Sequence, residues 1–523
     1  MARQRDPRLR LRGLAAAAIA LGVATLVAVP FGPHADARTA VGSAIIDLTP
    51  GPVKEWAIQN FGTNDKLFLS ISVLVVIAVI ATVTAQFEAV LVGSVAIGLA
   101  GVMAGAAVLT RSGARPVDVI PTLLGAVAGI TVLRLLMSER LGRRAATGPA
   151  TNTDTDTDTE APDLGRRRTL TAVGFLAAGT ASGVAGAILS RVTSSVAGDR
   201  NAFAPPVPKI SAAPVPATVQ PAGVELAPFI TPTADFYRID TALSVPQLDR
   251  QDWRLRIHGM VDREITYRFQ DLAQFEAVDK VVTLTCVSNP VGGNLISNAT
   301  WTGYRVRDLL AHAGPHADAD MVLSRSVDGF TAGTPIEALT DDRDSLLAVA
   351  MNGEPLPTEH GYPARLVVPG LYGYVSATKW LVDLDVTRFD RAQAYWTRLG
   401  WAERGPIKTE SRVDVPRDGA QIPRGPVTFG GVAWAQHRGV RAVEVRIDTP
   451  GGTGQWQPAQ LGANYSNDTW RLWSVPWHAQ DAGPHLITVR ATDGTGAVQT
   501  SQQADVMPDG ASGWHSVSFS VAA

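Results

Sequence analysis

The chain of 523 residues contains a single cysteine, Cys286. One thiol excludes intrachain disulfides, zinc sites built on paired cysteines, cysteine-ligated iron–sulfur clusters and c-type haem. Cys286 follows the apolar run 281–285 (VVTLT) and precedes 287–293 (VSNPVGG). A strand that runs into Asn-Pro and Gly-Gly delivers its last side chain into a loop, where a ligand can approach the backbone. The pattern predicts a thiol at a strand end as the centre of any chemistry.

Two other interpretations of this cysteine stay open at the level of the residues alone. A free cysteine is commonly a small buried hydrophobic residue. It can also be a nucleophile paired with histidine, for which His258, His312 and His316 lie nearby in the sequence. We favour a functional thiol because Cys286 is the only cysteine of a domain that we place outside the cytoplasm.

The sequence around Cys286 has a family resemblance. Residues 282–310, VTLTCVSNPVGGNLISNATWTGYRVRDLL, resemble the molybdenum-binding segment of the sulfite oxidase family. The resemblance continues through 346–381 and resumes at the triplets RDG (417–419), VAW (432–434) and GWH (513–515). It covers about residues 229–523, and several long motifs in one order make it specific.

The resemblance implies a molybdenum–molybdopterin cofactor with Cys286 as the catalytic metal ligand. A soft thiolate suits a soft, redox-active metal, and the cofactor performs oxygen-atom transfer. His360, Arg365 and Lys379 match the family's positions for the phosphate tail of the pterin. Arg238 matches an early active-site arginine that faces the metal and an oxyanion substrate. The full set of cofactor contacts implied is Tyr237, Arg238, Cys286, Asp328, His360, Arg365, Ser376 and Lys379.

One departure from the family bears on the substrate. Sulfite-oxidising members carry a tyrosine just before Met-Asn-Gly, where this chain has Val349. Valine neither donates a hydrogen bond to an oxyanion nor relays a proton, which argues against sulfite. One alternative is a reductase of sulfoxides or N-oxides on the same centre. Another, from a different class, is a cofactor-free membrane protein that displays an immunoglobulin-like interaction module.

The elements that must position these residues form two soluble blocks. The first, residues 233–400, is predicted to be an α+β molybdopterin-binding catalytic domain, with strands at 253–259, 281–286 and 365–369 and a helix at 304–313. The second, residues 405–523, has short β-rich runs between turns, among them 440–448, where Val443, Val445 and Ile447 alternate with charged residues. This spacing predicts an immunoglobulin-like β-sandwich, which the resemblance associates with homodimerisation. We expect Trp470, Trp473 and Trp477 to be packing residues.

The first third of the chain is predicted to span a membrane. Hydrophobic residues make up 46% of the chain and charged residues 18%. Five stretches are long and apolar enough for transmembrane helices, namely 13–33, 67–85, 89–110, 119–137 and 169–190. The first, with its basic start, also resembles a cleavable signal peptide. Eleven arginines in the N-terminus and in the loop before the last span favour a multi-pass protein whose catalytic domain lies outside the cytoplasmic membrane.

Two linkers flank the last span. Residues 141–168 form a cytoplasmic loop. It contains the low-complexity stretch TNTDTDTDTE at 151–160 and ends in Arg166-Arg167-Arg168. These arginines resemble a twin-arginine export signal, which would carry a folded, cofactor-loaded domain; the alternative is an ordinary positive-inside anchor. Residues 191–232 contain eight prolines after Phe203, which predicts a semi-rigid stalk.

The net charge and the lack of histidine in the predicted spans indicate which partners the protein has. A net charge of −2 and no basic face argue against nucleic acid. None of the five spans contains a histidine, so a bis-histidine membrane haem is not expected. We expect a small oxyanion or sulfoxide-like substrate and a separate electron-transfer partner.

Overall fold

The computed structural model describes residues 7–61, 65–87, 90–138 and 164–523. The chain divides into two compact units. The first comprises Met1–Ser195 with Thr241–Ser244, and the second Val196–Asp240 with Val245–Ala523. The cytoplasmic loop predicted at 141–168 lies outside the described residues as far as residue 163.

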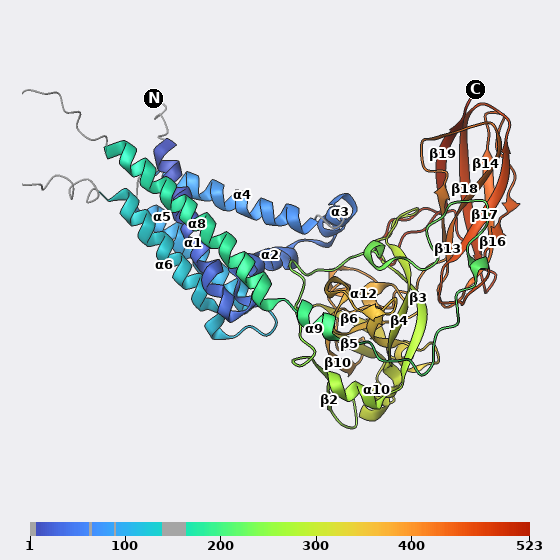
Figure 1. The fold of residues 1–523 in the computed structure, drawn as a ribbon, viewed down its shortest axis with the longest axis horizontal. Helices are drawn as coiled ribbons and strands as arrows, with labels where there is room; N and C mark the ends of the chain where they lie inside the picture. The colour runs from blue at the N-terminus through green and yellow to red at the C-terminus, as the bar shows by residue number, and fades with distance from the viewer. Residues whose placement is uncertain (1–6, 62–64, 88–89, 139–163) are drawn as a thin grey trace, which may run out of the picture. The chain divides into compact units, whose positions relative to one another are not determined.

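The first unit is helical (Figure 1). Its helices are α1 (Pro7–Ala28), α2 (Ala37–Leu48), α3 (Gly51–Phe61), α4 (Asp65–Ala85), α5 (Val90–Leu109), α6 (Ile120–Met137) and α8 (Leu164–Ser194). Among the described residues, five helical segments are long and apolar enough to cross a membrane, and each predicted stretch overlaps one of them, with the stretches 13–33 and 89–110 running one or two residues past the segment ends. The three arginines 166–168 belong to the first turns of α8 rather than to a preceding loop.

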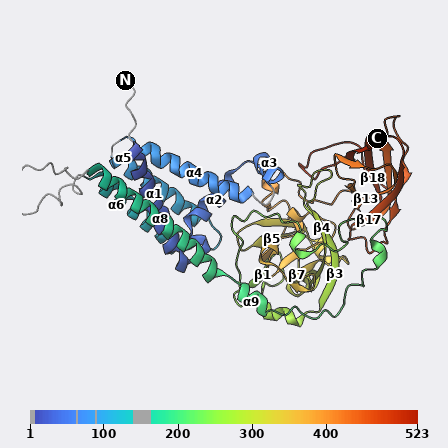
Figure 2. The same cartoon turned by 45° about the horizontal axis from the view of Figure 1, so that its top comes forward.

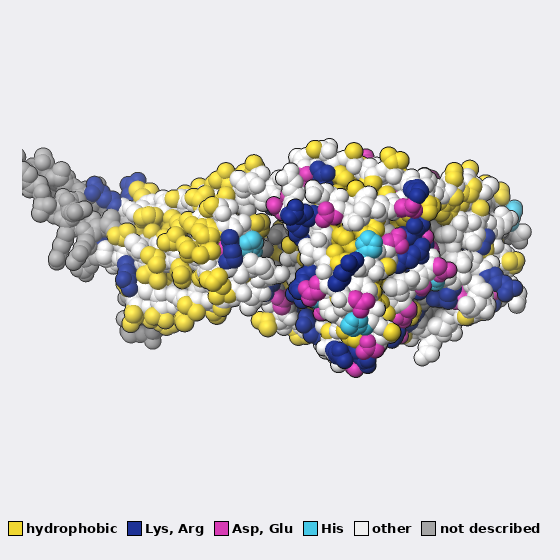
Figure 3. Space-filling view, turned by 90° about the horizontal axis from the view of Figure 1, so that it is seen from below, with side chains coloured by type: hydrophobic (Ala, Val, Ile, Leu, Met, Phe, Trp, Pro, Cys, Tyr) yellow, Lys and Arg dark blue, Asp and Glu magenta, His cyan; other side chains and the backbone are white. Residues whose placement is uncertain are grey.

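Small residues let these helices approach closely. A Cβ atom on Gly22 of α1 would lie 2.1 Å from the carbonyl oxygen of Gly179 in α8. A Cβ on Gly125 of α6 would lie 2.3 Å from the carbonyl oxygen of Ala20. Close packing through small residues is how helices associate in lipid. Figure 3 shows apolar side chains gathered over the surface of this unit, whereas charged side chains cover the second.

Residues 233–400 of the second unit, which we refer to as the catalytic region after the prediction above, contain two five-stranded sheets. One has the order β3-β4-β7-β8, with β9 also paired to β7, and the other has the order β2-β1-β10-β5-β6. Figure 2 shows β3, β4 and β7 running together. The strands of the first sheet are β3 (Ala277–Thr285), β4 (Ile296–Arg305), β7 (Leu346–Met351), β8 (Glu354–Pro355) and β9 (Arg365–Val367). Those of the second are β1 (Arg254–Gly259), β2 (Ile265–Arg268), β5 (Met321–Ser326), β6 (Thr331–Pro335) and β10 (Leu381–Thr387).

Three short helices lie between these strands in the described chain, namely α10 (Val306–Ala313), α11 (Glu337–Thr340) and α12 (Gly373–Ser376), and α9 (Ala197–Ala202) precedes them all. The prediction of a helix from residue 304 is wrong at its start, because Tyr304 and Arg305 extend β4 and pair with β7. The Tyr304 ring is buried, and aromatic residues favour such half-buried strand positions.

The C-terminal region consists of two sheets that face each other. One has the order β11-β13-β17-β16 and the other β12-β19-β18-β14-β15. Their inward side chains, including Phe429, Trp473, Val445, Ile487 and Phe519, form one core. The strands are β11 (Glu410–Val415), β12 (Ala420–Ile422), β13 (Gly425–Trp434), β14 (Val440–Asp448), β15 (Gln457–Pro458), β16 (Gln460–Leu461), β17 (Arg471–Ala479), β18 (Gly483–Asp493) and β19 (His515–Val521). We refer to residues 405–523 as the sandwich.

The proline-rich segment is not a stalk, and that prediction is wrong. Residues 203–232, which we name the strap, lie along both regions of the second unit. The Lys209 N–H donates to Ala277 O at 2.8 Å and the Thr231 N–H to Asn298 O at 2.7 Å. On the sandwich, Ala463 N–H donates to Thr218 O at 2.8 Å. Extended proline-rich backbone keeps its carbonyl acceptors free for neighbours, and its apolar side chains, such as Phe229, enter the shared core.

Candidate active site

The thiol lies where the sequence predicts it, directly after a strand. Strand β3 ends at Thr285, and the Cys286 N–H donates to Leu295 O at 2.9 Å. The Cys286 carbonyl accepts from the Asn289 N–H at 3.1 Å, and the Asn289 side chain accepts from the Leu295 N–H at 2.8 Å. These bonds close the loop between β3 and β4. Cys286 is 9% exposed, so the loop presents a largely covered sulfur.

Tyr237 is the ionisable side chain most clearly coupled to this sulfur. Burial raises the pKa of the Tyr237 phenol well above its usual value, the neighbouring Cys286 adds to the rise, and Arg365 opposes it. The Tyr237 N–H donates to Ser297 Oγ at 3.1 Å, and its ring stacks on Phe236 at 5.4 Å between centroids. The phenol therefore stays protonated beside the thiol and can donate a hydrogen bond.

Next to these groups lies a basic cluster of Arg238, His360, Arg365 and Lys379. Lys379 Nζ and Arg238 Nε bind the same oxygen of Asp240, at 2.8 and 2.9 Å. Lys379 Nζ also donates to Glu359 O at 3.1 Å. Strand β9 begins at Arg365, and β9 pairs with β7.

Arg365 lacks a carboxylate partner among the described residues. Its guanidinium is 5% exposed, lies 5.1 Å from the centre of the Trp301 ring and donates to the His360 carbonyl at 3.2 Å. The carboxylates that act on the basic cluster are Asp240 and Glu359, against the three cations Arg238, Arg365 and Lys379. A buried charge without a full counter-charge is costly unless an anion neutralises it.

Burial lowers the pKa of three basic side chains in this cluster. Burial lowers the pKa of Arg365 to about 10. Burial also lowers the pKa of Lys379 to about 8, against the opposing pull of Asp240. Burial, then Arg365 and Lys379, lowers the pKa of His360 to about 3, so its ring is neutral at pH 7. An anion placed here would oppose each of these shifts, because it favours the protonated, charged forms.

The structure treats the remaining predicted residues differently. Ser376 is fully buried, and its hydroxyl donates to Tyr372 O at 2.9 Å, so it faces the backbone of its own helix. Asp328 lies in the turn between β5 and β6, where its carboxylate accepts from the Phe330 N–H at 3.2 Å. The backbone of that turn contacts the residue after Lys379, because the Val327 N–H donates to Trp380 O at 3.0 Å.

The three histidines considered for a nucleophilic thiol lie elsewhere. His258 Nε2 contacts Asp383 at 3.0 Å, on the other sheet. His312 contacts the Tyr267 hydroxyl at 3.3 Å and His316 contacts Asp262 at 3.5 Å. Each of these three histidines therefore has a polar partner of its own.

Sequence reasoning missed two residues of this site. Asp240 links Arg238 to Lys379, and only its position two residues after Arg238 hinted at this. Asn289 is 3% exposed, and its Nδ2 group has no hydrogen-bond partner among the described residues. A buried amide donor left open three residues after the cysteine is a donor available to a bound group.

Comparison with known proteins decides the family. The oxidoreductase molybdopterin binding domain matches residues 242–396. The oxidoreductase YuiH of Bacillus subtilis, described as uncharacterized, is 34% identical over 157 residues, which are 30% of this chain and 76% of that protein. This chain belongs to the sulfite oxidase family.

Other members of the sulfite oxidase family match over longer stretches. Human mitochondrial sulfite oxidase is 31% identical over 294 residues, which are 47% of this chain and 53% of that protein. The nitrate reductase of Hordeum vulgare is 30% identical over 329 residues, covering 51% of this chain and 36% of that enzyme. The chain thus spans about half the length of the human and mouse sulfite oxidases it matches. The crystal structure of the sulfane dehydrogenase SoxCD from Paracoccus pantotrophus is 25% identical, with a TM-score of 0.46 over 53% of this chain and 76% of that one.

The residues present fit the molybdopterin cofactor of this family. The set offers one soft thiolate, an open amide donor on Asn289 and a buried basic cluster with an excess of positive charge. Thiolates suit soft redox metals, and guanidinium and ammonium groups suit phosphate. Gly373 lies close to these groups, because a Cβ there would be in van der Waals contact with Ala377 at 3.5 Å and with the Tyr237 hydroxyl and Thr285 O at 3.9 Å.

The neutral His360 predicts an acid-sensitive fold in cofactor-free protein. Its folded pKa is about 3, whereas an unfolded histidine titrates near 6.5. Between these values the unfolded chain binds a proton that the folded chain does not, so stability is full above pH 6.5 and falls toward pH 3. The slope reaches at most about 1.4 kcal/mol per pH unit.

The measurement is the free energy of unfolding of full-length protein across this pH range, for wild type and His360→Asn. The substitution should lower the slope of unfolding free energy against pH by up to about 1.4 kcal/mol per pH unit, which corresponds to one proton. Identical slopes in both proteins would show that His360 does not sit neutral in the basic cluster.

Proposed function

We propose that the chain is a membrane-anchored, extracytoplasmic molybdopterin-dependent oxidoreductase that transfers an oxygen atom at a cysteine-ligated molybdenum. The observation that carries the proposal is the thiol of Cys286 beside the basic cluster, in which Arg365 is buried without a carboxylate. A metal ligand and an anion site are thereby brought together by β3 and β9, which lie in one sheet.

Each residue has a stated task in this proposal. Cys286 holds molybdenum, and the phosphate tail of the pterin would lie against Arg365, Lys379 and His360. When bound, the molybdenum–pterin group supplies two-electron oxygen-atom transfer. Tyr237 keeps a phenol hydrogen available beside the sulfur, and Arg238, whose side chain is 33% exposed, offers a cation to an incoming substrate oxygen.

The substrate proposed is a small oxyanion or a sulfoxide-like molecule. The names of the relatives, sulfite oxidase and nitrate reductase, refer to enzymes of small oxyanions. Val349, where sulfite-oxidising members have tyrosine, is fully buried in β7 and offers no polar group. We therefore propose an oxyanion other than sulfite as the substrate, and keep reduction of a sulfoxide or N-oxide as the alternative on the same centre.

The helical unit supports a membrane anchor. Five segments have the length and composition of membrane spans, and α4 has apolar side chains such as Leu67 and Val75 that are more than half exposed. An apolar surface of this kind is stable in lipid. The distribution of positive charge supports an orientation with the second unit outside the cytoplasm, and the first turns of α8 would carry the twin-arginine export signal.

The sandwich and the electron route complete the proposal. Two facing sheets with a common core support an immunoglobulin-type domain, through which the protein would form a homodimer. Electrons would pass to or from a separate protein. We keep residues 233–400 and 405–523 as the bounds of the catalytic domain and the sandwich.

Metal content tests the proposal most simply. Wild type should contain molybdenum at about one atom per chain, and Cys286→Ser should lose at least about 90% of it, because a hydroxyl is a poor ligand for a soft metal. Metal analysis of purified full-length protein measures this, with the thermal midpoint of the cofactor-free protein as the control for folding. Folded wild type without molybdenum would favour the cofactor-free interaction protein instead.

Turnover assays separate the two directions of reaction. We expect purified protein to oxidise sulfite only slowly, because Val349 offers no hydrogen bond to that oxyanion. Assays with sulfite and with methionine sulfoxide, each with an artificial electron acceptor or donor, provide the comparison. Sulfite oxidation at the rates typical of enzymes, about 1–1000 per second, would contradict this substrate proposal.

Export is tested by replacing Arg166, Arg167 and Arg168 together with lysine. This change keeps the positive charge that sets topology, so a positive-inside anchor should be unaffected. Twin-arginine export predicts loss of protease-accessible second unit at the cell surface. Unchanged accessibility would remove the export signal from the proposal.

A further inference from the structure

Strand β3, which ends one residue before Cys286, is an edge strand of its sheet. A marginal strand leaves one row of backbone groups open. The strap pairs with its first half, where Ile210 and Val278 form a parallel bridge. The sandwich completes its second half, because the Thr283 N–H donates to Asp468 O at 3.0 Å. Segments outside the catalytic domain therefore pair with the open edge of β3, the strand that leads to Cys286.

Gln436, the second residue after β13, contacts the residue that directly precedes Cys286. It is 1% exposed, and its amide nitrogen donates to Thr283 O at 3.2 Å and to Thr285 Oγ1 at 2.8 Å. A carbonyl oxygen only accepts, so the nitrogen of the amide must face Thr283. Thr285 directly precedes Cys286, so this side chain of the sandwich is anchored one residue from the sulfur-bearing position.

The sandwich also holds the loop that follows the cysteine. Arg412 in β11 donates to Gly293 O at 2.6 Å. The His515 ring fills the space beside Gly292, where a Cβ would lie 2.2 Å from it. The His515 Nδ1 atom accepts from the Val413 N–H at 3.0 Å, which fixes the ring in place. Contacts from the sandwich therefore lie on both sides of Cys286 in the sequence.

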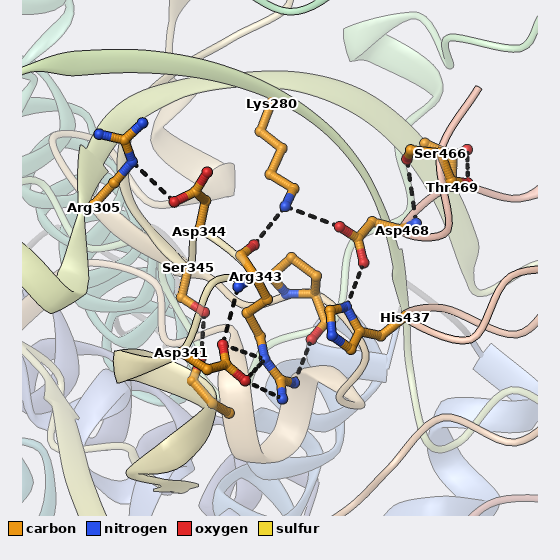
Figure 4. Close-up of polar contacts among 12 residues, drawn as sticks. Lys280, Arg305, Asp341, Arg343, Asp344, Ser345, His437, Ser466, Asp468 and Thr469 are labelled. Carbon is orange, nitrogen blue, oxygen red and sulfur yellow. Dashed lines mark hydrogen bonds and ion pairs between the residues drawn. The ribbon is translucent and has the colours of Figure 1, made fainter. Parts of the chain in front are cut away.

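A polar network stiffens this junction (Figure 4). The Asp468 carboxylate binds Lys280 Nζ at 2.9 Å and His437 Nδ1 at 3.0 Å. Burial alone would raise the pKa of Asp468, but hydrogen bonds from His437 and Lys280 bring it below its usual value. Lys280 also donates to the Arg343 carbonyl at 2.5 Å, and the Arg343 guanidinium binds Asp341 in a bidentate pair. The segment that pairs with Thr283 is thus tied to β3 by charge as well.

We propose that Gln436 is a positioning residue for Cys286: the sandwich sets the orientation of the thiol by holding Thr283 and Thr285 through this amide. The inference rests on the proposed function only in making the thiol a metal ligand; the positioning itself is a property of the cofactor-free fold. It gives the sandwich a task at the active site in addition to packing or dimerisation.

Alkylation of the thiol tests the proposal without any cofactor. Because Cys286 is the only cysteine, iodoacetamide reports on this position alone in the full-length protein. Gln436→Met keeps the side-chain length but removes both hydrogen bonds. It should raise the alkylation rate of cofactor-free protein about tenfold or more, because local opening then exposes the sulfur more often.

Gln499→Met is the matched control. Gln499 is likewise buried, at 4% exposure, and it bonds Ser411, Ala491 and Gly513, all within the sandwich. Its loss should weaken the sandwich yet leave the alkylation rate within about twofold of wild type. Equal rate increases in the two variants would overturn the proposal, since Gln436 would then act only through general stability.

A second variant keeps the test decisive if Gln436→Met folds poorly. Thr285→Val removes the acceptor of the same hydrogen bond and should also raise the alkylation rate. In the double variant the two increases should not multiply, because Gln436→Met already removes the hydrogen bond that Thr285→Val removes. Multiplying effects, or no effect of Thr285→Val, would overturn the proposal. A wild type that binds no molybdenum would defeat the proposed function but leave this comparison intact.

Discussion

An excess of buried positive charge is the constraint on which the catalytic region depends. Taking Arg365 and Lys379 out of water costs free energy, and Asp240 compensates only one side of the cluster. Such an arrangement persists in a folded protein when the rest of the fold is stable enough to hold it and when an anion completes it. The pairing of β9 with β7, the closure of the Cys286 loop and the burial of Tyr237 together place the thiol next to this basic cluster.

The fold meets this constraint by sharing one core between regions. Buried residues of the catalytic sheets, the strap and the sandwich belong to a single apolar cluster that includes Val219, Val281 and Trp434. The marginal strand β3 is covered along its length by the strap and by the Asp468 segment. A strand with both edges paired holds its register, so the side chain that follows it has a defined direction.

Much of this arrangement was predictable from the residues. The single cysteine between a β-rich run and Asn-Pro indicated a strand end, and β3 ends one residue before it. The alternation of Val443, Val445 and Ile447 matches β14, and the five apolar stretches match long helices. These features depend on local sequence period, which a single chain displays directly.

The rest depends on contacts between segments distant in sequence. The strap was predicted to be a stalk because proline content reports backbone stiffness but not the neighbours that such a backbone meets. Gln436 bonds Thr283 across about 150 residues, and no local pattern marks it. Asp240 joins Lys379 in the same way. Ser376 matches a family motif, yet its hydroxyl bonds its own helix, because motif position does not specify rotamer.

The central claim is that the sulfur of Cys286 binds molybdenum. X-ray absorption at the molybdenum edge of the purified full-length protein tests it directly, because the signal reports the sulfur atoms bound to the metal. The account predicts one sulfur ligand fewer in whatever molybdenum Cys286→Ser retains than in wild type. The same sulfur coordination in both proteins would contradict it.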